Sequence, residues 1–398
     1  MRENAEILDL FTSALECGRK MVLATVVDVS GSAYRRPGAH LLLVDDGRKA
    51  GSISAGCLEN DLLARGNQLF ESSECLLLEY ESDEFFGLNY GCDGTIFVFV
   101  QPVSASSCCS PVALKRVQET ARTCVLATVF DSDERALIGK QFLFDTETPG
   151  EPLFSSSELT LETNSASFRE ALADLRSEII ISSTEVARLN NNQKREFSFQ
   201  STKVFFEVIK PTLRLAVFGA GDDVIPLLHV ANSIGIETHI IDSRRSYLDR
   251  FASQSFIHTH DQNFSAETVL GATESTAAVI MSHSFELDKR FLSAVLETDC
   301  AFIGVMGSRK RTLKLLKELG AESQVSRIRF PIGLDIGAET PEEIALSICS
   351  EVLAFFRNAS GKPLTSLKGN IHRRTDSESI YQLSEKRTAQ CTIGDTIG

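Results

Sequence analysis

Two cysteines stand on glycine-rich turns in the first quarter of this chain. Cys57 follows the run GSISAG and opens an expected helix, and Cys92 lies in the run YGCDG. A helix start lowers the pKa of a thiol, and glycine lets a ligand approach the backbone. Two such thiols could contact one soft ligand, such as the dithiolene of a metal complex or a sulfur atom. The alternative interpretation of Cys57 is a small buried packing residue.

The run LAVFGAGDDV predicts a strand, a glycine turn and a helix, which is the context of a dinucleotide-binding fingerprint. Gly219 and Gly221 occupy the turn, and Asp242 lies 23 residues beyond Gly219, where an acid binds the ribose of NAD. Val224 stands where a third glycine or alanine is usual. The aspartates at 222–223 put negative charge where a pyrophosphate needs a positive field. A Rossmann-like domain that binds NAD(P) and one with another use are both open interpretations.

Two further turns follow expected strands. His283 follows TAAVIMS and is a candidate acid or base, or the donor of a structural hydrogen bond. Gly307, Ser308 and Arg309 follow AFIGVM and begin a helix. The amides of this helix start, with Arg309 and Arg311, could form a cradle for a phosphate or pterin oxygens. The alternative is a solvated basic turn. Open α/β sheets bind ligands at the carboxyl ends of their strands, so we expect these turns to share one rim.

The run PIGLDIGAETPEE at residues 331–343 joins a glycine-studded loop to a helix start. The segment 340–343, TPEE, offers an N-cap, a proline at the first helical position and a capping box. A helix needs only these caps. Gly333, Asp335 and Gly337 are additional, so the loop is predicted either to bind a ligand on the same rim or to be a structural loop.

Composition limits the partners that this chain can have. It has 398 residues, a formal net charge of −14 and a pI of about 5.1, which argues against nucleic acid or an anionic membrane as a general partner. No apolar run is long enough for a membrane span, and the N-terminus lacks a secretory signal, so we expect a cytoplasmic protein. The ten cysteines contain no CxxC and the seven histidines no HxxxH. We interpret His258 and His260 as structural, with a metal role as the alternative.

The chain contains a weak internal repeat, VLATVVD at 22–28 and VLATVFD at 125–131. From residue 212 onward, strands and helices alternate with the βαβ rhythm of a doubly wound parallel sheet. The predicted organisation is an N-terminal α/β domain (1–103), a linker (104–122), a second, degenerate α/β unit (123–211), a Rossmann-like α/β domain (212–358) and a polar disordered tail (359–398).

Several segments, taken together and in order, resemble the XdhC/CoxI family of accessory proteins of molybdenum hydroxylases. The matching segments are ATVVDVSGSAYRRPGAHLLL, GSISAGCLE, YGCDGTIFVFVQP, VFGAGDD, HSFELD, FIGVMGSRKR and RIRFPIGLDIGAETPEEIALSI. The last two are far more specific than a lone glycine motif. The resemblance covers most of residues 20–103 and 212–356.

The resemblance implies a homodimeric chaperone that binds the molybdenum cofactor, cooperates with a cysteine desulfurase in its sulfuration and inserts it into a xanthine dehydrogenase-type enzyme. By position, the GCxE motif of the family supplies Cys57 and Glu59. Its GCGG turn falls at residues 91–94, where Asp93 replaces a glycine.

A binding and delivery protein, not a turnover enzyme, is therefore the leading hypothesis. Cys57 and Cys92 would contact the molybdenum or its sulfur, and the rim with Arg309 and Asp335 would hold the pterin or phosphate. The first alternative is an NAD(P)-dependent oxidoreductase with His283 as acid or base. The second is a sulfurtransferase that carries a persulfide on Cys57.

Overall fold

The computed structural model describes residues 2–31, 34–54, 56–72, 74–80, 94–104, 109–145, 154–155, 159–161, 178–182, 185–190, 193–198, 202–261, 265, 269–271 and 273–367. The chain divides into a large compact unit, Met1–Gly361, and a short second unit, Lys362–Gly398. Most of the predicted tail, from residue 368, falls outside the described residues. None of the described helices has the length and apolar character needed to cross a membrane.

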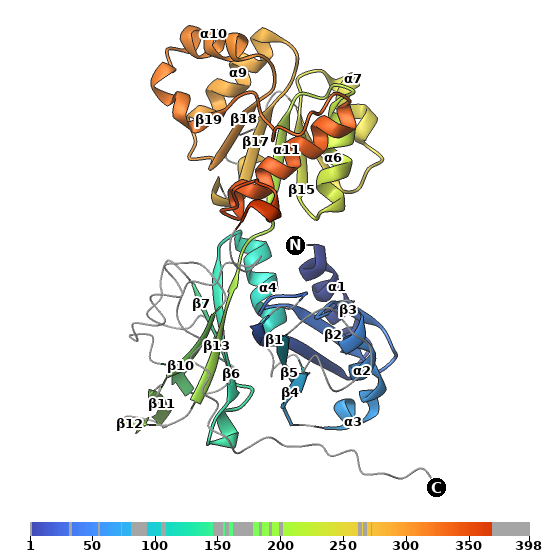
Figure 1. The fold of residues 1–398 in the computed structure, drawn as a ribbon, viewed down its shortest axis with the longest axis vertical. Helices are drawn as coiled ribbons and strands as arrows, with labels where there is room; N and C mark the ends of the chain where they lie inside the picture. Colours follow the sequence, from blue (N-terminus) through green and yellow to red (C-terminus); the bar gives the residue numbers. More distant parts are fainter. Residues whose placement is uncertain are drawn as a thin grey trace. The chain divides into compact units, whose positions relative to one another are not determined.

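The first part of the large unit is a five-stranded antiparallel sheet of order β3-β2-β1-β5-β4 with helices (Figure 1). On the central strand, Met21 and Leu23 enter one apolar cluster and Val22 and Ala24 enter another, as the alternation of a buried strand requires. Its elements are α1 (Arg2–Glu16), β1 (Met21–Gly31), β2 (His40–Val44), β3 (Lys49–Gly51), α2 (Cys57–Ala64), α3 (Gly66–Glu71), β4 (Leu76–Tyr80) and β5 (Gly94–Val103).

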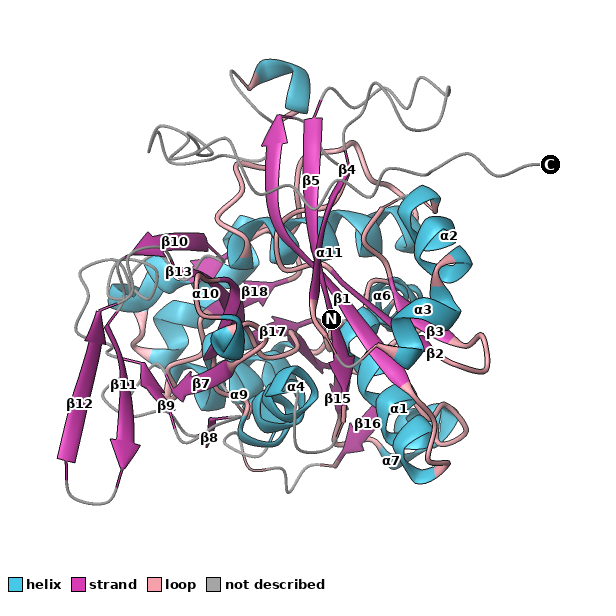
Figure 2. Cartoon of the chain, turned by 90° about the horizontal axis from the view of Figure 1, so that it is seen from below, coloured by secondary structure: helices cyan, strands magenta, loops and turns pink. Residues whose placement is uncertain are grey.

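The second part forms another five-stranded sheet, of order β10-β13-β6-β7-β8. A separate small sheet, β12-β11-β9, contains the hairpin of β11 and β12 (Figure 2). The elements are α4 (Cys109–Thr120), β6 (Cys124–Asp131), η1 (Arg135–Leu137), β7 (Gln141–Asp145), β8 (Phe154–Ser155), β9 (Leu159–Leu161), β10 (Glu178–Ser182), β11 (Glu185–Asn190), β12 (Gln193–Ser198) and β13 (Thr202–Ile209). Helix α4 falls within the predicted linker 104–122, and its Ala113, Leu114 and Val117 are buried in the core.

The internal repeat is present in these two sheets. The order β2-β1-β5 of the first corresponds to β7-β6-β13 of the second. The central strands β1 and β6 each have a β-bulge at the equivalent position. The pairing of β1 with β5 skips Val27, and the pairing of β6 with β13 skips Phe130. These two residues form one buried cluster with Phe99 and Phe205. The two units therefore pack against each other through equivalent residues.

The third part confirms the predicted Rossmann-like domain. Six strands in the order β16-β15-β14-β17-β18-β19 are all parallel, with α6 and α11 packed on one face and α9 and α10 on the other (Figure 1). The short strand β19 is an addition to the five strands expected from the sequence. The elements are β14 (Arg214–Phe218), α6 (Val224–Ser233), β15 (Glu237–Ile241), α7 (Arg245–Leu248), η2 (Asp249–Phe251), β16 (Ile257–His260), η3 (Thr273–Ser275), β17 (Thr276–Ile280), α9 (Phe285–Leu296), β18 (Phe302–Val305), α10 (Arg309–Leu319), η4 (Glu322–Arg327), β19 (Ile328–Arg329), α11 (Pro341–Phe356) and η5 (Leu364–Ser366).

The caps predicted for α10 and α11 are confirmed. Ser308 caps α10 by accepting the backbone N–H of Arg311, and Gly320 ends that helix with a left-handed φ of 61°. Thr340 and Glu343 form the capping box of α11, satisfying amides that the helix itself cannot bond. Both helices therefore begin at fixed residues beside the carboxyl edge of the sheet.

Candidate functional site

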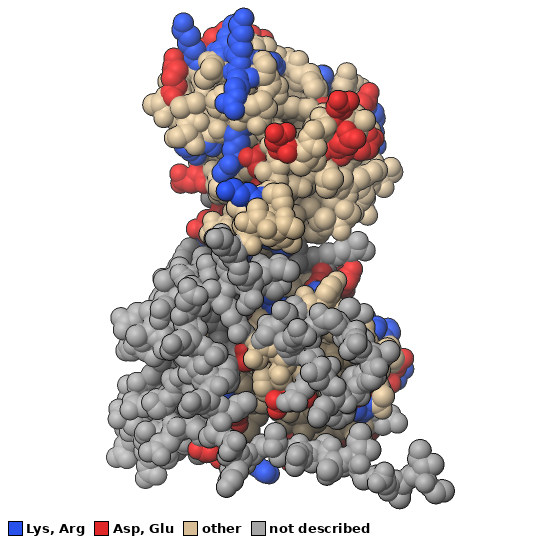
Figure 3. Space-filling model, in the orientation of Figure 1, with Lys and Arg blue, Asp and Glu red and all other residues tan. Residues whose placement is uncertain are grey.

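The carboxyl edge of the parallel sheet collects the candidate residues of the Rossmann-like domain. Gly219 follows β14, Asp242 follows β15, His283 follows β17, Gly307 follows β18 and Gly333 follows β19. Because all six strands run in the same direction, these turns lie on one edge. Figure 3 shows Lys and Arg side chains gathered on the α10 side of this domain and Asp and Glu side chains on the α7 side.

The turn after β14 depends on its glycines for packing. Gly219 has φ 126°, and a Cβ at this position would lie 2.5 Å from the Cα of Ser282. A Cβ at Gly221 would lie 2.5 Å from Oδ1 of Asp223. Gly219 therefore lets the turn after β17 pack closely against the turn after β14.

The two aspartates at the start of α6 are both paired. Asp222 forms an ion pair with Arg250, whose guanidinium also donates to the backbone oxygen of Ala220. Asp223 Oδ2 lies 2.8 Å from Nε2 of His283, a residue with a left-handed φ of 60° and a side chain 59% exposed. These partners reduce the repulsion that the two carboxylates would exert on an anion at this turn.

Asp242 is completely buried and its oxygens are occupied. Oδ2 accepts the backbone N–H of Ala220 at 2.8 Å, and Oδ1 accepts the backbone N–H of Arg244 at 2.8 Å. The Arg244 guanidinium donates to both oxygens, at 2.9 and 2.6 Å. Burial opposes ionisation, but the bonds from Arg244 outweigh it and lower the pKa of Asp242. A ribose would have to displace one of these donors.

The turn after β17 is held by a second buried carboxylate. Asp288 in the first turn of α9 accepts the backbone N–H of Ser282 at 3.0 Å and its hydroxyl at 2.5 Å. Its other oxygen accepts Nη1 of Arg311 at 2.5 Å, and the Asp288 side chain is only 1% exposed. The turns after β17 and β18 are therefore joined by an ion pair.

The start of α10 offers unused donors. Gly307 has φ 117°, and Arg309 is exposed, whereas Arg311 folds back onto Asp288. Nη2 of Arg311 is buried and has no hydrogen-bond partner among the described residues. The sequence predicts Arg309 and Arg311 as one anion cradle, but their side chains have different surroundings. The buried donor and the helix N-terminus are the features here that suit an anion.

The loop 331–337 is tied to α11. The backbone N–H of Gly333 donates to Glu351 at 2.6 Å, and the hydroxyl of Ser347 donates to the backbone oxygen of Leu334 at 2.6 Å. A Cβ on Gly333, which has φ 116°, would overlap the Ser347 hydroxyl. The last part of the loop, Asp335, Ile336 and Gly337, is exposed. One half of the predicted loop is thus structural, and the other faces solvent.

In the first sheet, the GCxE motif forms a turn held by its acid. Cys57 is the first residue of α2, after Gly56 with φ 119°. Glu59 is 2% exposed and accepts the backbone N–H groups of Ile53, Ser54 and Gly56 at 3.0, 2.8 and 3.0 Å. Burial opposes its ionisation, but hydrogen bonds led by that from the Ser54 hydroxyl lower its pKa to about 2. Cys92 and the turn 91–93 lie outside the described residues.

Sequence reasoning missed the ion pair that links Asp222 to Arg250, and the roles of Glu59 and Asp242 as turn anchors. Asp222 and Arg250 are 28 positions apart, so no short-range pattern in the sequence predicts this ion pair. The short GCxE spacing does carry a signal for Glu59, because an acid at the third helical position can accept the amides that precede the helix. The start of α10 thus has hydrogen-bond donors of the kind that an anionic group accepts, and Cys57 stands at a separate helix start, that of α2.

Comparison with known proteins finds family matches in the first and third parts of the large unit. Residues 14–81 match the XdhC and CoxI family, and residues 215–352 match the XdhC Rossmann domain, which together make up more than half of the chain. The chain is 28% identical over 359 residues to a probable xanthine dehydrogenase subunit of Bacillus subtilis, covering 86% of this chain and 96% of that protein.

Two further relatives extend along most of the chain. The molybdenum cofactor insertion chaperone PaoD of Escherichia coli is 22% identical over 355 residues, 88% of each chain. A crystal structure described as a xanthine dehydrogenase from Bacillus halodurans matches with a TM-score of 0.65 and 25% identity, over 91% of this chain and 98% of that one. The chain therefore belongs to the XdhC and CoxI family.

Proposed function

We propose that this chain binds the molybdenum cofactor and delivers it to a xanthine dehydrogenase-type molybdenum hydroxylase. The names of two relatives support the proposal, since one is a molybdenum cofactor insertion chaperone and the other a probable xanthine dehydrogenase subunit. The buried acids of the sheet edge, Asp242 and Asp288, are bonded to backbone amides and arginines, which is the arrangement of structural carboxylates.

The observation that carries the proposal is the set of donors at the start of α10. Nη2 of Arg311 is buried without a partner among the described residues, and it lies in the helix turn that Ser308 caps. Arg309 adds an exposed positive charge, and Gly307 leaves room, since among the described residues only the Arg311 side chain lies near its Cβ position, at 3.6 Å. The phosphate and pterin oxygens of the cofactor are acceptors that suit such donors.

The sulfur chemistry of the proposal belongs to the first sheet. Cys57 would contact the molybdenum or its sulfur from the start of α2, with Glu59 holding the turn that precedes it. Cys92 remains a predicted second contact. Sulfuration with a cysteine desulfurase and assembly as a homodimer are part of the same proposal and follow from the family resemblance.

The NAD(P) alternative is distinguished by Asp242. In a dinucleotide enzyme this acid binds the ribose, whereas here Arg244 and the amide of Ala220 occupy it. The sulfurtransferase alternative predicts a persulfide on Cys57, which adds about 32 Da after incubation with a desulfurase. Mass spectrometry of the intact chain and of Cys57→Ala distinguishes that activity from cofactor binding alone.

The test is the affinity for the molybdenum cofactor of three variants in α10. Arg309→Ala removes the exposed charge, and Arg311→Lys keeps a cation for Asp288 while removing the buried Nη2 donor. Lys317→Ala is the matched control, because it removes a positive charge from the last turn of the same helix. We expect the first two to weaken binding of the molybdenum cofactor about tenfold or more and the control to leave it unchanged. Wild-type affinity in all three variants would reject the sheet edge as the binding site.

A further inference from the structure

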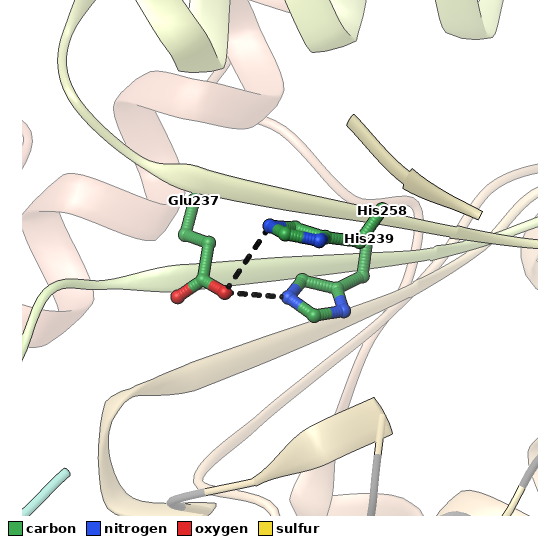
Figure 4. Close-up of side chains that lie close together, drawn as sticks. All are labelled: Glu237, His239 and His258. Carbon is green, nitrogen blue, oxygen red and sulfur yellow. Dashed lines mark hydrogen bonds and ion pairs between the residues drawn. The ribbon is translucent and has the colours of Figure 1, made fainter. Parts of the chain in front are cut away.

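A cluster of histidines lies on β15 and β16, at one edge of the Rossmann-like sheet. His239 on β15 is paired in register with His258 on the edge strand β16. Glu237 lies two residues before His239, and His260 lies two residues after His258. Side chains at alternate positions of a strand share a face, so the register brings all four to one face of the sheet. Figure 4 shows Glu237, His239 and His258 converging there.

The donor atoms are at the separation that a metal site requires. Glu237 Oε1 lies 2.8 Å from Nε2 of His239 and 3.7 Å from Nε2 of His258. One donor atom from each of the three residues lies within 4.8 Å of the other two. Ligand atoms around a tetrahedral Zn²⁺ at 2.0–2.1 Å are about 3.3 Å apart, a value between the two observed distances.

The three side chains offer ligand types that such a metal prefers. Imidazole nitrogen and carboxylate oxygen both bind Zn²⁺ and other divalent transition metals.

The cluster has one deep ligand and one accessible ligand. The His239 side chain is 7% exposed and that of Glu237 is 33% exposed, whereas that of His258 is 55% exposed on an edge strand. An ion can therefore reach the site from solvent. Arg214, whose Nη2 lies 3.2 Å from Glu237 Oε1, is the competing cation, and Asp261 is the other charged neighbour of His260.

We propose that Glu237, His239 and His258 form a binding site for a divalent transition-metal ion of the Zn²⁺ class. Each residue supplies one ligand atom, and a fourth position stays open for water. Nε2 of His239 must then be unprotonated, so its proton resides on Nδ1. That atom lies 2.9 Å from Nε2 of His260, which accepts the proton's hydrogen bond and fixes the tautomer. His260 is thus a positioning residue, and no part of the proposal depends on binding of the molybdenum cofactor.

The test is titration of the full chain with Zn²⁺ and Co²⁺, with Mg²⁺ as the hard-ion comparison. We expect one equivalent of Zn²⁺ to bind and Mg²⁺ to bind much more weakly. His258→Ala removes an exposed ligand with little risk to folding and should weaken binding about tenfold or more. His229→Ala, an exposed histidine of α6 outside the cluster, is the matched control and should bind as wild type.

The ten cysteines require a spectroscopic check. Co²⁺ held by imidazole and carboxylate lacks the near-ultraviolet charge-transfer band that thiolate ligands produce. The expected spectrum therefore has visible ligand-field bands without that band, and the bands are lost in His258→Ala. Absence of stoichiometric Zn²⁺ binding, a thiolate spectrum, or equal affinity of wild type and His258→Ala would each overturn the proposal.

Discussion

The buried carboxylates of Glu59, Asp242 and Asp288 hold turns by accepting hydrogen bonds from backbone amides. Glu59 holds the turn before Cys57, and Asp242 and Asp288 hold the turns after β14 and β17. Each carboxylate is almost completely removed from solvent. Their effect on a ligand is therefore indirect, because they fix the backbone on which the thiol or the glycines are placed.

Replacing Glu59 by glutamine tests this anchoring. The amide cannot accept from all the donors that surround the carboxylate, so we expect Glu59→Gln to lower the free energy of unfolding by about 2–3 kcal/mol at pH 7. The pKa of Glu59 is depressed from 4.5 to about 2 in the folded chain, so its contribution is present above pH 4.5 and is lost as the pH falls towards 2. Denaturant unfolding at several pH values measures both effects.

The control for this substitution is Glu71→Gln, because the side chain of Glu71 is 76% exposed. Loss of the Glu71 carboxylate should change the free energy of unfolding by no more than about 0.5 kcal/mol. An equal effect of the two substitutions at pH 7 would contradict the anchoring role of Glu59.

At the scale of elements, the turns that end parallel strands differ in how tightly they are packed. Gly219 and Gly307 both have a positive φ, 126° and 117°. A Cβ on Gly219 would meet the backbone of the next turn at 2.5 Å, whereas the nearest atom to a Cβ on Gly307 is a flexible arginine side-chain carbon at 3.6 Å. We expect Gly307→Ala to cost about 1–3 kcal/mol from backbone strain, and Gly219→Ala to cost more through added steric overlap. Thermal unfolding of the pair checks this order, and equal costs would mean that the two turns are not packed as described.

The elements themselves were largely predictable from the sequence, whereas their cross-connections were not. Capping residues such as Ser308 and Thr340 act over three positions, and strand runs are local, so α10, α11 and β14–β18 follow from patterns. The pair of Asp222 with Arg250, and the register of His239 with His258, depend on which strands become neighbours. Strand order is set by packing of the whole sheet, and a single sequence does not show it.

At the scale of the whole molecule, the duplicated sheets are joined by polar pairs as well as by the phenylalanine cluster. His40 on β2 bonds to Glu207 on β13 at 2.7 Å, and the equivalent contact joins Gln101 on β5 to Gln141 on β7 at 3.4 Å. His40 also bonds to Thr25, as Gln141 does to Thr128. The contact of His40 with Glu207 can thus carry charge, whereas the contact of Gln101 with Gln141 is neutral.

Substituting His40 by glutamine, the residue at the equivalent position, tests the charged connection. Burial lowers the pKa of His40, but the charge and hydrogen bond of Glu207 outweigh it and leave the pKa raised above 6.5. A raised pKa contributes stability below pH 6.5 that is lost as the pH rises through the folded value. We expect wild type to lose more stability than His40→Gln between pH 6 and pH 9. Parallel pH profiles would show that the pair is not ionised.

The most direct test of the proposed function is a pair of titrations of the purified chain, one with the molybdenum cofactor and one with NADH, each repeated with Cys57→Ala. The account predicts saturable binding of the cofactor, weakened by the substitution, and no binding of NADH at millimolar concentration. Binding of NADH without binding of the cofactor would contradict the account, and it would mean that the turn at Gly219 and Asp242 accepts a dinucleotide despite the bonds that now occupy it.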